Sequence, residues 1–154
     1  MKRVFLISFF ILTTLQVTAQ ANREKIKAMK TAFITNALDL SSKEAEKFWP
    51  IYNEYDKRIY RAKTIKTREI AQRVRAAGGV QQLSNSQASN ILQEFIDIDF
   101  EVAKAKQDLK NKLINVVSAK KIILLFRAEQ DFNKKLLRDF REQRQKNLQK
   151  RIRN

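Results

Sequence analysis

"LSSKEAEKFWPIYNEY", residues 40–55, contains the pattern that decides the fold of this chain. Glu44 follows Ser41 by three residues, which is the spacing of a capping box, in which each side chain satisfies a backbone N–H that the start of a helix leaves free. Leu40 is placed to pack on Ala45 as a hydrophobic staple. Apolar residues then recur every three or four positions, at Ala45, Phe48, Tyr52 and Tyr55. The stretch therefore predicts the capped start of an amphipathic helix.

A hydrophobic residue followed by serine occurs again at two later points of the chain. The second start has glutamine at the third position after the serine, which completes a capping box, whereas the third start has Lys121 there and lacks the acidic or amide partner. The residues of these two starts are Leu83, Ser84, Gln87, Val117 and Ser118. Three helices are thus predicted to begin in the same way.

Glycine occurs only as the pair Gly78-Gly79 and proline only once, and this scarcity of helix breakers favours long helices with few joints. The apolar periodicity predicts four helices, at about 22–38, 42–77, 85–116 and 119–148. At about 1.5 Å per residue the last three are about 45–55 Å long. We therefore expect an all-α fold in a thin, elongated, antiparallel arrangement, whose exposed side a second copy would cover.

Each predicted helix carries an apolar stripe that we expect to face the core. In the first helix the stripe is Ile26, Met29, Phe33 and Ala37, widened by Ile34 and Leu38. In the third it runs from Ala88 through Ile91, Phe95, Ile98 and Val102 to Leu113 and Val116, and in the fourth it is Ile122, Leu125, Phe132, Leu136 and Phe140. The run "KIILLF" (121–126) is apolar on nearly every side and predicts a central, buried turn.

Pro50 lies inside the second predicted helix, beyond the first turn. There it removes one hydrogen bond, to the carbonyl of Glu46, and is expected to bend the helix. Large aromatic residues surround it, and we interpret them as core that anchors the bend. The alternative is a client or partner surface, for which the candidates are Phe48, Trp49, Tyr52, Tyr55 and Arg58.

The first twenty residues, "MKRVFLISFFILTTLQVTAQ", have the pattern of a secretory signal peptide. Lys2 and Arg3 precede an apolar run, and Val17 and Ala19 are the small residues that a signal peptidase accepts. We predict that residues 1–19 are cleaved and that 20–154 form a single helical domain. A membrane anchor is the less favoured alternative, because the apolar run is shorter than the ~20 residues that a span needs.

The composition excludes most chemistry. The chain has no cysteine and no histidine, so it lacks thiol and imidazole nucleophiles, an imidazole base and the usual transition-metal ligands. We find no glycine-rich phosphate loop, and we expect no enzymatic activity, no cofactor and no metal. The net charge of +16 favours polyanionic partners. Outside the inner membrane these are phospholipid head groups, lipopolysaccharide and acidic unfolded polypeptides; nucleic acid is the least favoured.

Charge is unevenly distributed along the chain. Residues 138–154 hold seven Lys/Arg against two acids, and the apolar pattern thins after Phe140, which predicts a frayed helix end or a disordered tail from about 141. This tail is either simply solvated or contacts polyanions through Arg141, Arg144, Lys146, Lys150, Arg151 and Arg153.

Three acids that share one side of the third helix, Glu94, Asp97 and Glu101, are expected to pair with Lys and Arg. Acid-first pairs at i,i+4, such as Glu54–Arg58, are expected within the helices.

The chain resembles the LTxxQ-motif family of periplasmic proteins, the Spy and CpxP type of chaperones and stress regulators. The residues that carry the resemblance are the export signal, the repeated Leu-Ser-x-x-Gln/Glu helix starts, and the runs "AEKFWPIYNEYD" (45–56) and "SAKKIILLFRAEQDFNKKLL" (118–137). These runs are most similar to a branch labelled sensor of ECF-type sigma factor. The resemblance covers essentially the whole chain after the signal peptide.

The resemblance implies a thin, curved, antiparallel dimer of long helices, with a basic concave face that holds unfolded clients without ATP. It also implies a periplasmic location in a Gram-negative-type envelope. The predicted function is therefore binding of unfolded protein, or of a signalling partner such as a membrane regulator, in the envelope stress response. The alternative is a peripheral module that binds anionic lipid or lipopolysaccharide.

Overall fold

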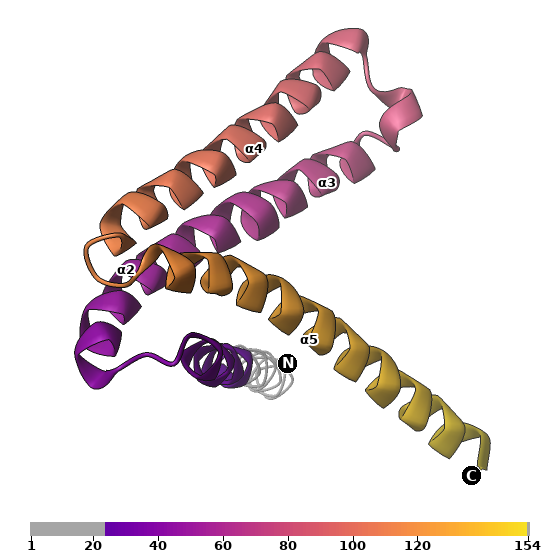
Figure 1. Ribbon diagram of the computed structural model, residues 1–154. Coiled ribbons are helices and arrows are strands. Elements are labelled where there is room, and N and C mark those ends of the chain that lie inside the picture. Colours follow the sequence, from indigo (N-terminus) through magenta and orange to yellow (C-terminus); the bar gives the residue numbers. More distant parts are fainter. Residues whose placement is uncertain (1–23, 154) are drawn as a thin grey trace, which may run out of the picture. The chain divides into compact units, whose positions relative to one another are not determined.

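The computed structural model describes residues 24–153, and over this range it contains helices and turns without strands (Figure 1). This confirms the predicted all-α fold. The first helix is described over 24–38. It is followed by α2 (Ser42–Tyr60), a π-helix η1 (Arg61–Lys66), α3 (Thr67–Ala76), a short η2 (Val80–Gln82), α4 (Asn85–Leu113) and α5 (Ala119–Arg153). The predicted signal peptide, residues 1–19, lies outside the described residues.

The described residues group into two compact units, and the boundaries fall beside two of the predicted serine starts. One unit is residues 41–122, which contains α2, η1, α3, α4 and the first turn of α5. The other contains residues 24–40 and 123–153. The sequence predicted one helical domain; the two units are described separately below.

The three serine starts begin helices as predicted. The Ser41 hydroxyl accepts a hydrogen bond from the Glu44 N–H at 3.3 Å, and the Glu44 carboxylate accepts one from the Ser41 N–H at 2.8 Å. Ser84 and Gln87 repeat this arrangement at 3.2 and 2.9 Å. Ser118 accepts a hydrogen bond from the Lys121 N–H at 3.3 Å. Local sequence alone therefore sets these helix starts.

The glycine pair ends α3, also as predicted. Gly79 donates its N–H to the Val74 carbonyl at 2.9 Å and Gly78 donates to the Arg75 carbonyl at 3.0 Å, which are the two hydrogen bonds of a Schellman motif. Both glycines have positive φ, 90° and 103°, and glycine adopts these angles without the steric cost that other residues incur. The chain can then turn back into α4.

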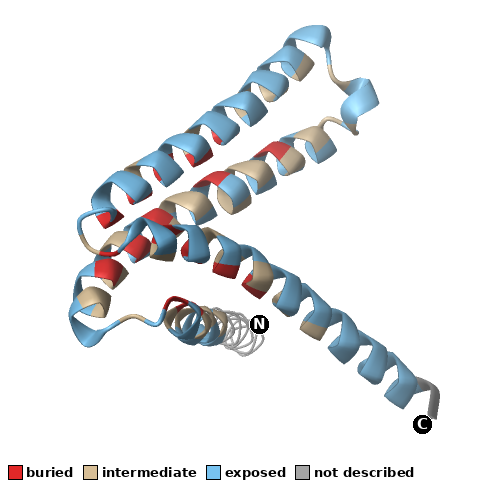
Figure 2. Ribbon diagram, in the orientation of Figure 1, coloured by how far each residue is buried: buried red, intermediate tan, exposed pale blue. Residues whose placement is uncertain are grey.

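α2, η1 and α3 form one continuous helix that packs against α4 as an antiparallel pair, called here the hairpin (Figure 1). The helix continues through Pro50, and its axis changes direction within α2, consistent with the predicted bend. Buried positions lie on the facing sides of the two rods (Figure 2). The buried residues of the two rods are Phe48, Tyr52, Tyr55, Ala62 and Ile70 on the first rod, and Ile98, Val102, Ala105, Leu109 and Leu113 on α4. Phe95, predicted to be core, is exposed instead.

Four ion pairs between described side chains flank this seam. Lys112 binds Glu54 at 2.7 Å, Arg58 binds Asp108 at 2.8 Å, Lys66 binds Glu101 at 2.6 Å, and Arg73 binds Glu94. The predicted pairing of Glu94 and Glu101 with basic residues is confirmed. The predicted Glu54–Arg58 pair within α2 is wrong, because both residues bind α4 across the seam. Exposed pairs of this kind stabilise little individually, but they report the register of the two helices.

The π-helix changes that register by one residue. From the Glu54 pair to the Arg58 pair, both helices advance by four residues, and from the Lys66 pair to the Arg73 pair both advance by seven. Between the Arg58 and Lys66 pairs, however, the first rod advances by eight residues and α4 by seven. η1 lies in this interval. A π-turn holds more residues than an α-turn, so η1 absorbs one extra residue while the ion pairs on both sides form.

In the unit formed by 24–40 and 123–153, Phe33 contacts Phe132 with ring centroids 5.8 Å apart, and Lys30 lies 3.7 Å from Glu129. Ile34 and Leu38 are buried, whereas Met29 and Ala37 are exposed. The predicted core stripe of the first helix is therefore confirmed at Phe33, Ile34 and Leu38 and wrong at Met29 and Ala37. The buried residues of the 123–153 segment are Leu125, Ala128 and Phe132.

Three features of the last two helices differ from the predictions. α4 ends at Leu113 rather than 116, because the chain turns there toward Ser118, and the Val117 N–H bonds the Leu113 carbonyl at 2.9 Å. The "KIILLF" turn is not buried all round, since Ile123 is 70% exposed. Finally, α5 continues to Arg153, where a frayed or disordered tail was predicted. Apolar periodicity reports burial, whereas this segment is helical because it consists mainly of strong helix formers without Gly or Pro.

Candidate functional site

The aromatic cluster around Pro50 is mainly core. Phe48, Tyr52 and Tyr55 are 0–5% exposed. Phe48 stacks on Tyr52 with centroids 5.6 Å apart, and Trp49 meets both rings edge-on at 5.1 and 5.6 Å. Arg58, the fifth candidate, binds Asp108. Three of the five candidates for a client surface, Phe48, Tyr52 and Tyr55, are therefore buried, and Trp49 alone among the four rings is partly exposed.

Glu44 joins the starts of two helices. Its carboxylate accepts from the Ser41 N–H within the capping box and also from Lys121 Nζ at 2.8 Å. Lys121 stands at the third position after Ser118, where a capping box has Glu or Gln. Its side chain does not complete a capping box and instead forms an ion pair between α5 and α2. The pKa of Glu44 is lowered from 4.5 to about 2, first by the hydrogen bond from Lys121 and then by those from Ser41.

Acid is expected to destabilise the unit formed by residues 41–122 through Glu44. Because its pKa is lower in the folded than in the unfolded protein, Glu44 contributes stability above about pH 4.5 that is lost as the pH falls toward about 2. The pKa values of Glu54, Glu94 and Asp108 are lowered too, by hydrogen bonds from Lys112, Arg73 and Arg58 respectively. Urea unfolding midpoints should therefore decrease across this range.

Glu44→Gln tests this expectation. The variant should be less stable than the wild type near neutral pH, and the difference should narrow as the pH falls through the range below about 4.5. Glu46→Gln, at an exposed position two residues along the same helix, is the matched control and should follow the wild type. A Glu44→Gln difference that stays constant from neutral pH to acid would contradict the assigned role of the carboxylate.

Large apolar side chains gather on the outward side of α4. Leu92, Ile96 and Phe100 recur every four residues and are 63, 42 and 71% exposed, and Phe95 beside them is 42% exposed. These four residues are called the α4 apolar surface. The predicted apolar stripe of this helix did not include Leu92, Ile96 or Phe100; the sequence signal for them is a second i,i+4 apolar series in the same helix. Isolated exposed apolar residues are ordinary, but a cluster of this kind is typical of interaction surfaces.

The basic tail candidates lie along the last part of α5. Arg141, Arg144, Lys146, Lys150 and Arg151 are all exposed, as are the apolar Leu137, Phe140 and Leu148. The side chain of Arg153 lies outside the described residues. The α5 end therefore presents mixed basic and apolar side chains on a helix.

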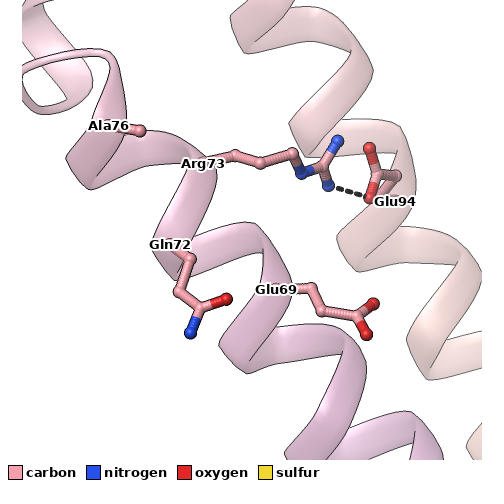
Figure 3. Close-up of a pocket in the computed structure, with 5 residues that line it drawn as sticks. All are labelled: Glu69, Gln72, Arg73, Ala76 and Glu94. Carbon is pink, nitrogen blue, oxygen red and sulfur yellow. Dashed lines mark hydrogen bonds and ion pairs between the residues drawn. The ribbon is translucent and has the colours of Figure 1, made fainter. Parts of the chain in front are cut away.

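A depression in the hairpin lies near its glycine turn, where α3 faces α4 (Figure 3). Its lining is Glu69, Gln72, Arg73, Ala76 and Glu94. The guanidinium of Arg73 points at the Glu94 carboxylate and pairs with it, so the strongest charges of the depression satisfy each other. This ion pair raises the pKa of Arg73 and lowers that of Glu94. The Arg73–Glu94 pair in the depression is one of the four ion pairs that flank the seam.

Among the described residues, no group of three or more carboxylate, histidine or cysteine side chains is arranged to hold a metal ion. Within the same residues, no helix is both long enough and apolar enough to cross a membrane. Asp97, the third acid of the predicted acidic side, accepts a hydrogen bond from Gln93 at 3.0 Å.

Over the described residues the chain is an all-helical protein, and its exposed surface includes apolar and basic side chains on long helices. Comparisons with protein family models, with curated protein sequences and with solved structures found no match to it.

Proposed function

We propose that this is an exported, non-enzymatic helical protein that binds unfolded or partly folded proteins, or a signalling partner, in the envelope stress response. The α4 apolar surface is the observation that carries the proposal. Its Leu92, Ile96 and Phe100 present large side chains to solvent on the side of α4 away from the buried seam. Apolar segments of an unfolded chain bury area on such a surface, at about 25 cal/mol per Å² of apolar area.

The charge of the chain supports the same function. With 32 basic and 16 acidic residues, a complex with an apolar client keeps a large net charge and remains soluble. The resemblance to the Spy and CpxP type of protein is the reason to place this activity in the periplasm. The signal-peptide pattern of residues 1–19 points to the same compartment.

The test is suppression of aggregation of a chemically denatured client, followed by light scattering. Wild-type protein at stoichiometric amounts should suppress the aggregation. Leu92→Ser combined with Phe100→Ser should abolish most of this effect while the helical content by circular dichroism stays unchanged, because both side chains are largely exposed.

The matched control is Val80→Ser. Val80 is 70% exposed, like Phe100, but it lies in η2 and outside the α4 apolar surface. This variant should suppress aggregation as the wild type does. Absence of suppression by the wild type, together with no partner in pull-down experiments, would refute the proposal.

A second candidate function is binding to anionic lipid or lipopolysaccharide at the envelope surface. The observation that favours it is the number of exposed basic side chains on the described helices. Basic residues near an anionic leaflet contribute about 1 kcal/mol each. Co-sedimentation with anionic vesicles that disappears at moderate salt would support it.

A further inference from the structure

The first rod of the hairpin contains a segment of concentrated positive charge. Residues 57–68, "KRIYRAKTIKTR", hold six basic residues and no acid, and are called the basic segment. They span the end of α2, all of η1 and the start of α3. Over these residues the rod is about 16 Å long at α-helical rise, so the charges form a short, dense array.

The ion pairs divide this array into two sets. Arg58 and Lys66 bind Asp108 and Glu101 on α4. Among the described residues no carboxylate lies within ion-pairing distance of the other four, which are exposed: Lys57, Arg61, Lys63 and Arg68. Four basic side chains are therefore left unneutralised on the part of the rod that does not face α4.

The extra residue of the π-helix lies within this same segment. If the first rod had one residue fewer between Arg58 and Lys66, a regular α-helix would bring these two residues to the same partners on α4, as the register of the ion pairs indicates. The packing of the hairpin therefore does not require η1. π-turns are rare and are frequently found at functional sites, and the exposed charged residues of η1 are Arg61 and Lys63.

We propose that the exposed part of the basic segment binds the phosphate head groups of an anionic lipid surface. This proposal rests on the second candidate function and names its site. The four exposed charges are spread over about 16 Å of the rod, and an anionic surface offers many phosphates over such a distance. Tyr60, 38% exposed within the segment, is a residue type that suits a membrane interface. The net charge of +16 attracts the protein to such a surface over a longer range.

The experiment is co-sedimentation of protein purified from cells that express the full-length chain. Vesicles of mixed phosphatidylglycerol and phosphatidylcholine are compared with vesicles of phosphatidylcholine alone. A variant combining Lys57→Gln, Arg61→Gln, Lys63→Gln and Arg68→Gln removes the unneutralised charges. Its partition onto anionic vesicles at low salt should fall at least about tenfold, since each basic residue near the surface contributes several-fold.

The matched control removes four charges from the α5 end, with Arg141→Gln, Arg144→Gln, Lys146→Gln and Lys150→Gln. It has the same net charge as the first variant and should stay within about threefold of the wild type. If this control loses binding and the first variant retains it, lipid binding stands but the assigned surface is wrong. If the wild type binds neither kind of vesicle, both the candidate function and the site are refuted. Binding to polyglutamate but not to vesicles would contradict the lipid assignment.

Discussion

Deletion of Thr64 is expected to leave the hairpin folded, with a free energy of unfolding within about 1 kcal/mol of the wild type. Thr64 lies in η1, where the first rod advances by eight residues against seven in α4. Removing one residue equalises the two helices, so that η1 can become a regular α-helix. The ion pairs Arg58–Asp108 and Lys66–Glu101 should then form as before. Urea unfolding followed by circular dichroism measures the effect.

Deletion of Gln107 is the matched control, because this exposed residue lies in α4 between the partners of the same two ion pairs. The deletion increases the difference between the two helices in the number of residues that separate the two ion pairs. It also rotates one part of α4 by about 100° relative to the other. Either Leu109 and Leu113 or Ile98 and Val102 then leave the seam, and each large side chain contributes about 1.5–3 kcal/mol when buried. The loss approaches the whole stability of a typical domain. Equal effects of the two deletions would show that η1 does not correct the register.

Phe48→Ala is expected to destabilise the protein by about 3–5 kcal/mol. Phe48 is fully buried and contacts the rings of both Trp49 and Tyr52, so its removal leaves a cavity and loses two aromatic contacts. Urea unfolding followed by the fluorescence of Trp49, the only tryptophan in the chain, measures the change directly.

Phe100→Ala provides the comparison within the same residue type. Phe100 is 71% exposed, and its truncation should change the stability by less than about 0.5 kcal/mol. If Phe48→Ala lowers the free energy of unfolding as little as Phe100→Ala does, the interpretation of the aromatic residues around Pro50 as core is wrong. The two substitutions thus separate the packing role of the first aromatic cluster from the binding role proposed for the α4 apolar surface.

The serine starts, the glycine pair and the helical class follow from short-range sequence. A capping box needs only residues three positions apart, and a Schellman turn needs only glycine at positive φ, so neither depends on distant partners. The predictions at Ser41, Ser84 and Gly78-Gly79 are confirmed for this reason. Long runs without Gly or Pro indicated the helices themselves.

The choice of core side chains within each helix was predicted less well. Phe95, Met29 and Ala37 were predicted buried and are exposed, whereas Ile34 and Leu38, which widen the predicted stripe, are buried. An apolar stripe wider than one helical face is compatible with several orientations, and only the neighbouring helix selects one. The α4 apolar surface escaped prediction for the same reason.

Sequence by itself determined the helical class, the three serine-capped helix starts and the end of α3, because these depend on hydrogen bonds between residues a few positions apart. Tertiary structure decided which apolar residues are buried, which carboxylate each basic residue binds, and where the extra residue of η1 is accommodated. These depend on the register of two helices whose contacting residues are up to about sixty positions apart, as in Glu54 with Lys112. Local apolar periodicity indicates which face of a helix is apolar. It does not indicate which residues of two helices lie opposite each other, because a helix shifted along its partner presents the same kind of apolar stripe.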